Sequence, residues 1–174
     1  MRLITRTTLA AAVALLACSA AWAEVSVTYV KPEDYLDVPR SEIERDRMLK
    51  DFSDYFAKLD KKLPAGQTLK IEVLDIDLAG RLYPRYNGED IRILKGGADW
   101  PRMDLRYTVE QDGRVVRSGE AKLSDMMYLE HSRLIHRNES LRYEKQMLDD
   151  WFSKTFDVKV RGARGKVNTA KVDG

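Results

Sequence analysis

Residue types that carry much of protein chemistry are scarce in this sequence of 174 residues. It has two histidines and a single cysteine, Cys18, which lies close to the N-terminus. Because the rest of the chain has no cysteine, it cannot contain disulfides, thiolate metal sites or cysteine nucleophiles. An apolar run from Leu9 to Ala17 is much shorter than the ~20 residues that a membrane span requires. Without disulfides, the folded part must be held together by an apolar core.

The motifs of common enzyme classes are also missing. The sequence contains no G-x-S-x-G elbow of a serine hydrolase, and neither His131 nor His136 belongs to a zinc motif. Residues 162–166 resemble a phosphate loop only superficially, because the glycine spacing is short and no serine or threonine follows Lys166. We therefore predict no catalytic residue, no metal ligand and no cofactor with any specificity.

The N-terminus has the pattern of a secretory signal. Arg2 and Arg6 are the only charges before Glu24, an apolar run follows them, and Ala21-Trp22-Ala23 fits a cleavage site. We predict that residues 1–23 are removed after Ala23 and that the protein is exported, most plausibly to the periplasm. No transmembrane span is expected in the mature protein.

A second interpretation of this region involves the cysteine. Leu15-Leu16-Ala17-Cys18 resembles a bacterial lipobox, which would make Cys18 the lipid-anchored first residue. Leu16 is bulkier than the residue usually found there, whereas the site ending at Ala23 fits ordinary cleavage well. Lipid anchoring at Cys18 remains the alternative.

The charge of the chain changes with cleavage. Lysine and arginine number 30 against 28 acidic residues, and loss of Arg2 and Arg6 makes the two equal. The pI near 8.6 is thus no sign of specific nucleic-acid binding. We predict one domain over residues 24–158, long enough to bury a core. A basic tail without aromatic residues follows at 159–174 and is predicted to be disordered.

Hydrophobic periodicity predicts the secondary structure. Alternation over 24–30 indicates a strand, and Ser41 with Glu44 forms a capping box before an amphipathic helix that ends near Pro64. The strand over 68–78 changes phase, which predicts a β-bulge near Val73-Leu74. A short strand is expected at 91–94, and Asn138 is expected to cap a final helix over 139–156.

A β-hairpin is predicted around Asp112-Gly113, with strands over 102–110 and 114–123. A three-residue loop over 111–113 keeps one face of the hairpin apolar. The resulting pairs are Val109 with Val115, Leu105 with Gly119, and Met103 with Ala121. The outer face then carries Arg102, Asp104, Arg106, Glu120 and Lys122. The predicted fold class is α+β, with two main helices on one face of a largely antiparallel sheet of four or five strands.

Four short segments of the sequence, taken together, resemble those of a known family. They are Asp75-Ile76-Asp77-Leu78-Ala79-Gly80, Trp100-Pro101-Arg102, Ser124-Asp125-Met126-Met127-Tyr128-Leu129, and Tyr143-Glu144-Lys145 with Asp149-Asp150-Trp151-Phe152. They resemble an uncharacterised family of secreted proteobacterial proteins known only as a domain of unknown function. The resemblance covers nearly the whole mature chain and implies an exported single domain, but it supplies no activity or ligand.

Two groups of residues are candidates for function. Asp75 and Asp77 share a strand face and form a candidate carboxylate pair, for which salt bridges to Arg81 or Arg85 are the simpler explanation. The second group interleaves arginines with aromatic residues, a composition typical of binding surfaces. It comprises Arg81, Arg85, Arg92, Trp100, Arg102 and Arg106. Ordinary pairing of these arginines with neighbouring acids is the alternative.

Three functional hypotheses follow. The first is a non-catalytic envelope accessory or binding domain, whose partner is another envelope protein or an anionic envelope surface. The second is a metal-dependent or carboxylate-based hydrolase that uses Asp75, Asp77 and His131. The third is a structural envelope protein that self-associates through an open sheet edge.

Overall fold

The computed structural model describes residues 25–84, 86, 90–130 and 136–161. The predicted signal, Cys18, Arg85, His131 and residues 162–174 of the tail lie outside these ranges. The elements in chain order are β1 (Ser26–Tyr29), η1 (Pro32–Asp34), α1 (Glu42–Asp60), β2 (Gln67–Asp77), β3 (Arg81–Tyr83), β4 (Ile91–Ile93), β5 (Arg102–Gln111), β6 (Arg114–Ser124) and α2 (Arg142–Phe156). Within the described ranges, no helix combines the length and apolarity needed to cross a bilayer.

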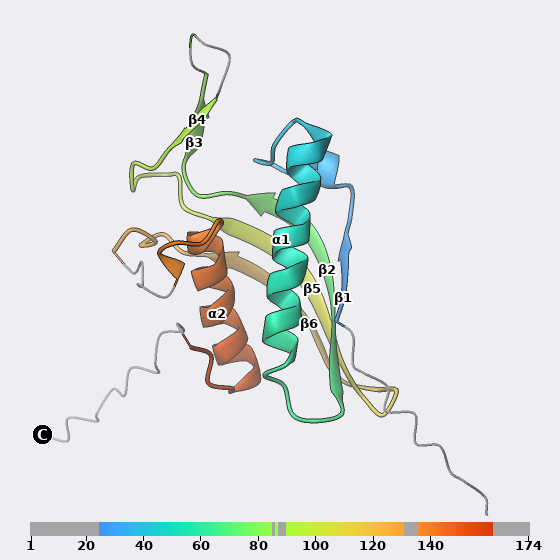
Figure 1. Ribbon diagram of the computed structural model, residues 1–174. Coiled ribbons are helices and arrows are strands. Elements are labelled where there is room, and N and C mark those ends of the chain that lie inside the picture. Colours follow the sequence, from blue (N-terminus) through green and yellow to red (C-terminus); the bar gives the residue numbers. More distant parts are fainter. Residues whose placement is uncertain (1–24, 85, 87–89, 131–135, 162–174) are drawn as a thin grey trace, which may run out of the picture.

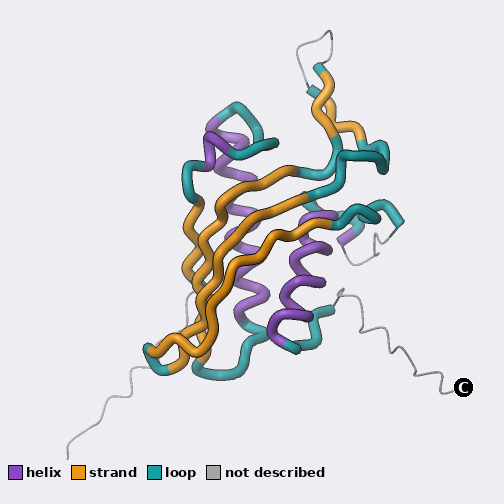
Figure 2. The backbone as a smooth tube through the Cα atoms, turned by 180° about the vertical axis from the view of Figure 1, so that it is seen from behind, coloured by secondary structure: helices purple, strands orange, loops and turns teal. Residues whose placement is uncertain are grey.

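A four-stranded sheet forms one layer of the domain and two helices form the other. The strand order is β1-β2-β5-β6, and α1 and α2 lie on the same face (Figure 1). Seen from behind, the opposite face of the sheet is uncovered (Figure 2). The predicted α+β class is confirmed. The sheet is mixed, because β1 runs parallel to β2 while the other two pairs are antiparallel.

The short strand expected near residue 91 exists, but it does not join the main sheet. β4 pairs antiparallel with β3, and the two form a separate arm that projects beyond the end of the sheet (Figure 1). The arm leaves the body at Gly80, whose positive φ of 85° suits glycine. A Cβ there would also lie 2.7 Å from the Ile93 carbonyl oxygen, so the close approach of the two strands requires glycine.

Helix α1 and strand β2 supply much of the core. The apolar stripe predicted for this helix is buried from Leu49 to Leu59, whereas Ile43 in the first turn is exposed and Leu63 beyond the helix is half-buried. Ser41 is the N-cap residue, but its side chain makes no capping hydrogen bond. The predicted bulge in β2 is confirmed, because the pairing with β5 shifts between Val73 and Asp75. This extra residue keeps both apolar sets of β2 on the core side.

The register predicted for the β5–β6 hairpin was wrong. Asp112 and Gly113 form a two-residue turn, both with positive φ, and Gln111 pairs with Arg114. A register shift beyond Glu110 leaves Val116 as the extra residue of a bulge. Met103 therefore faces Leu123 and Leu105 faces Ala121, two residues from the predicted partners. The apolar face is kept because a shift of two residues preserves the alternation of side chains.

The outer face of the hairpin is charged, as predicted. Arg106 contacts Glu120 at 2.7 Å and Glu72 at 3.7 Å, and Lys122 lies 3.7 Å from Asp104. These groups are exposed, so their pairs contribute little to stability.

Helix α2 begins later than predicted and is unusually buried. Its N-cap residue is Leu141, in a left-handed conformation, and not Asn138. Residues 143–152 are all buried, although half of them are polar or charged. Charged groups at buried positions require partners, so the buried acids and lysine of α2 must contact polar groups nearby.

Candidate functional site

The candidate arginines that the structure describes each lie beside a carboxylate. Arg92 donates to both oxygens of Asp37, at 2.7 and 3.2 Å, and also to the carbonyl oxygens of Ala79 and Gly80. Arg106 belongs to the outer sheet face. Arg92 and Arg106 therefore lie on different parts of the surface.

The remaining two described arginines share one buried acid. Arg81 and Arg102 lie 3.6 and 3.7 Å from Asp77, and Arg102 also stacks on Trp100. Arg81 and Arg92 line a broad hollow of about 990 Å³ at the base of the arm. Their guanidinium groups are nevertheless committed to Asp77 and Asp37, so they act as clamps between loops and the sheet.

The two candidate carboxylates have structural partners too. One oxygen of Asp75 accepts from the backbone N–H groups of Leu36 and Ile76, at 2.9 Å each. Asp77 is buried, and burial raises the pKa of its carboxyl even though Arg81 and Arg102 lower it. Among the described residues no group of three or more ligands could hold a metal ion.

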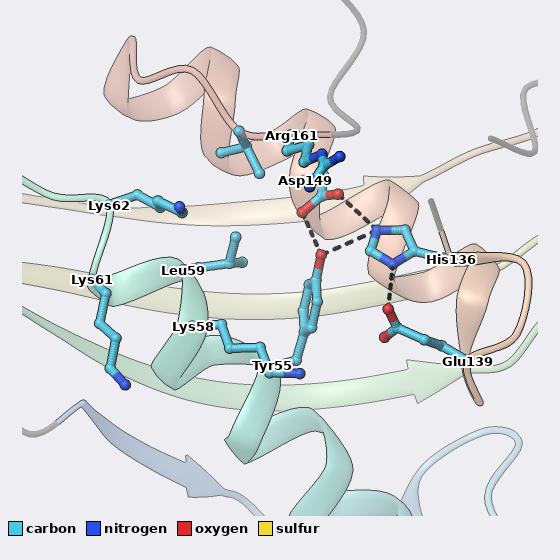
Figure 3. Close-up of a pocket in the computed structure, with 10 residues that line it drawn as sticks. Tyr55, Lys58, Leu59, Lys61, Lys62, His136, Glu139, Asp149 and Arg161 are labelled. Atoms are coloured by element: carbon cyan, nitrogen blue, oxygen red, sulfur yellow. Dashed lines mark hydrogen bonds and ion pairs between the residues drawn. The ribbon is translucent and has the colours of Figure 1, made fainter. Parts of the chain in front are cut away.

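A buried cluster that the sequence did not reveal lies between the two helices (Figure 3). Asp149 of α2 is fully buried and accepts a hydrogen bond from Tyr55 of α1. Its other oxygen lies 2.8 Å from Nε2 of His136, and Nδ1 of the same ring lies 3.3 Å from Glu139. One imidazole ring is thus placed between two carboxylates.

The cluster continues to a buried lysine. The Nζ atom of Lys145 contacts Glu139 at 3.2 Å and Asp51 at 3.1 Å, and its side chain is only 4% exposed. Ser140 also donates to Asp51. The chain of contacts joins α1, the turn before α2, and α2 itself. It satisfies the buried charges and fixes how the two helices meet.

The pKa directions follow from this arrangement. Burial alone would lower the pKa of His136, but hydrogen bonds and charge from Asp149 and Glu139 outweigh it and raise the pKa. Burial and the charge of Asp149 raise the pKa of the Tyr55 hydroxyl. For Glu139, contacts with Lys145 and His136 overcome burial and lower the pKa. Both ring nitrogens of His136 face carboxylates, so this imidazole lacks the free nitrogen that a general base requires.

A pocket of about 390 Å³ opens beside this cluster. Tyr55, His136, Asp149 and Glu139 form one part of its lining, and Leu59 and Val160 add apolar surface. Four cationic side chains complete the lining (Figure 3). They are Lys58, Lys61, Lys62 and Arg161, and together they are called the cationic rim.

The cationic rim differs from the arginines described above. Its four residues are exposed, and none forms an ion pair with a carboxylate among the described residues. Three of them lie at the C-terminal end of α1: Lys58 in the last turn, Lys61 at the C-cap and Lys62 directly after it, where cations stabilise the helix dipole. Four cationic side chains line the pocket against two carboxylates, Glu139 and Asp149. The pocket is therefore biased towards negatively charged groups.

Sequence reasoning missed this site because its parts are distant in the chain. In the sequence, Tyr55 is one residue of the amphipathic helix that ends near Pro64, and His136 belongs to no zinc motif. The two are separated by 81 residues. One signal was available in the sequence. Asp149 lies between Leu148 and Trp151, two apolar residues of the predicted final helix, so its carboxylate could be expected to be buried and to need a partner.

Comparison with known proteins gives a family without a function. A family model described as "Protein of unknown function (DUF3016)" matches residues 23–154. No curated protein and no solved structure matches the chain.

Proposed function

The chain belongs to the family of proteins of unknown function called DUF3016, and we propose that it is a non-catalytic binding domain that acts in the bacterial envelope. The binding site in this proposal is the pocket beside Tyr55 and His136, not the arginine-rich segment. We also propose that the protein is exported to the periplasm, with cleavage after Ala23. The family is proposed to be proteobacterial. The N-terminal pattern of charges, apolar run and small residues supports export.

One observation carries the proposal: the pocket is open, but the reactive groups in its wall are already bonded to one another. His136, Tyr55 and Asp149 share three short contacts. A ligand can contact this wall without finding a free base or nucleophile. About 390 Å³ falls within the size range of small-ligand sites.

The competing hydrolase hypothesis has less support. Asp75 accepts from two backbone N–H groups and Asp77 lies between two arginines, so neither carboxylate faces an open site with a water-activating partner. These contacts give Asp75 and Asp77 a role in holding the fold together, without any catalytic function.

The proposal is tested by ligand screening with the purified protein. Fractionated small molecules from the envelope of the host would be added, and thermal unfolding would be followed. A compound present at a hundredfold over its Kd stabilises the native state by about 2.7 kcal/mol. We expect the compound to be recovered with unchanged mass. Its conversion to a product would contradict a non-catalytic role.

A blocking variant identifies the pocket as the place of binding. Lys62→Trp puts a large ring at the rim and is expected to abolish the stabilisation. Lys50→Trp is the matched control, because Lys50 is a highly exposed residue of α1 that does not line the pocket. Stabilisation that survives in Lys62→Trp would refute binding at this pocket.

A second candidate function, self-association, is favoured by the edge of the sheet. Strand β6 has eleven residues and is the last strand of the sheet, with Val115 and Val116 exposed near its start. Such an edge is a template for another strand. Light scattering over a range of concentrations tests this, and a molar mass that stays at one chain throughout would exclude it.

A further inference from the structure

We propose that the ligand of the pocket is an anion, a phosphate, sulfate or carboxylate group attached to a small apolar body. This inference rests on the proposed function and names the class of ligand. Its basis is the juxtaposition of the cationic rim, Lys58, Lys61, Lys62 and Arg161, with an aromatic and aliphatic wall.

The first argument is the lack of partners for the rim. Most lysines and arginines described above are held by an acid: Arg92 by Asp37, Lys145 by Asp51 and Glu139, and Arg106 by Glu72 and Glu120. In the described part of the chain, the four rim residues have no such acid within 4.0 Å. Like charges that line one cavity repel one another, and a bound anion relieves that repulsion.

The second argument is that the acids in the wall already have partners. The two acids of the pocket, Asp149 and Glu139, both have partners: Asp149 contacts Tyr55 and His136, and Glu139 contacts His136 and Lys145. They are therefore poor partners for a cationic ligand. The charges left to attract a ligand are those of the rim.

The third argument is the apolar part of the lining. Leu59 and Val160 are buried core residues that reach the pocket, and the ring of Tyr55 extends from α1 toward Asp149 and His136 (Figure 3). A ligand that carries a short apolar portion beside its anionic group would cover this surface. Inorganic phosphate alone would use only the rim.

The test measures binding to the pocket by amide signals of the full chain labelled with ¹⁵N. Three probes are titrated: phenyl phosphate, inorganic phosphate and benzyl alcohol, which shares the ring but lacks the charge. We expect phenyl phosphate to shift the signals of Tyr55, Leu59 and Val160 in a saturable manner. Benzyl alcohol should bind at least about tenfold more weakly, because it lacks the charge-assisted contacts.

Two matched triple variants separate the rim from total charge. In the first, Lys58→Gln, Lys61→Gln and Lys62→Gln remove the lysines of the rim. The control, Lys50→Gln, Lys70→Gln and Lys122→Gln, removes three lysines that pair with Asp54, Glu110 and Asp104. We expect the rim variant to lose at least about tenfold in affinity for phenyl phosphate, and the control to stay within about twofold.

The outcomes distinguish this inference from the proposed function. Equal binding of benzyl alcohol and phenyl phosphate, unchanged in the rim variant, would overturn the anionic ligand while leaving a binding pocket. If no probe of either kind shifts the pocket signals, both the inference and the proposed site are wrong.

The source of the anion is found with vesicles. Pelleting with phosphatidylglycerol vesicles but not with phosphatidylcholine vesicles, lost in the rim variant, assigns the anion to a lipid headgroup. Binding of phenyl phosphate without pelleting assigns it to a soluble compound. Either result supports the anionic site.

Discussion

Two cationic regions of this molecule look alike in composition but differ in what surrounds them. At the end of the sheet, Arg81, Arg92 and Arg102 are each held by a buried or half-buried aspartate. Beside the helices, the cationic rim faces a pocket and has no acid partner among the described residues. Pairing, and not the number of positive charges, therefore decides which region is available to a ligand.

For the three lysines of the rim, the difference has a physical cause in the kind of side chain. The planar fork of arginine matches a carboxylate at two points, so it suits the fixing of loops such as the one that contains Ala79 and Gly80. Lysines in the last turn of a helix gain from the dipole without any partner and stay solvated. The same charge thus serves folding in one region and remains free in the other.

The largest effect is expected from loss of the buried acid below the pocket. Asp149→Ala leaves the His136 ring and the Tyr55 hydroxyl without their shared acceptor, and should lower the unfolding free energy by about 3–5 kcal/mol. Urea denaturation measures this loss. Asp54→Ala, which removes an exposed acid of α1, should change little. A loss for Asp149→Ala as small as that of the control would show that the cluster contributes nothing to the fold.

The arginine clamp should come next. Arg92→Ala removes a bidentate contact with Asp37 and is expected to cost about 2–3 kcal/mol. Arg92→Lys should recover only part of this, because an ammonium group cannot form the fork. Arg106→Ala on the exposed sheet face should have no resolvable effect in the same urea experiment. Equal losses for Arg92→Ala and Arg106→Ala would contradict the distinction between clamp and surface.

The protonation of His136 predicts a dependence of stability on pH. Its pKa is raised in the folded state, so its contribution is fully present below the unfolded value of about 6.5. The contribution is lost as pH rises above 6.5 through the folded pKa. His136→Gln should remove this part of the profile, measured as unfolding free energy between pH 5 and about 9. Parallel profiles for the two proteins would mean that His136 does not titrate differently on folding.

The smallest effect on stability is expected at the rim. Each of Lys58→Gln, Lys61→Gln and Lys62→Gln should change the unfolding free energy by no more than about 0.5 kcal/mol, because these side chains are exposed and unpaired among the described residues. Thermal unfolding of the single variants measures this. A much larger loss would show that the rim serves the fold and would remove the contrast with the arginine clamps.

Local patterns were sufficient to predict a large part of the fold. The apolar spacing of α1, the phase change in β2 and the alternation in β5 each depend on residues close in sequence, and the structure confirms them. The hairpin shows where such reasoning stops. The bulge at Val116 and a longer turn both keep the apolar face, so the pattern could not choose between them.

The sequence by itself thus determined the α+β class, the main helices and strands, and the charged outer face of the sheet. Only the tertiary structure decided which charges are paired. It brings Tyr55, His136 and Asp149 together across 94 residues, and it places Asp37 against Arg92 across 55. The reason is physical: periodicity reports which face of an element is buried, whereas a contact between two polar groups depends on how whole elements pack against each other.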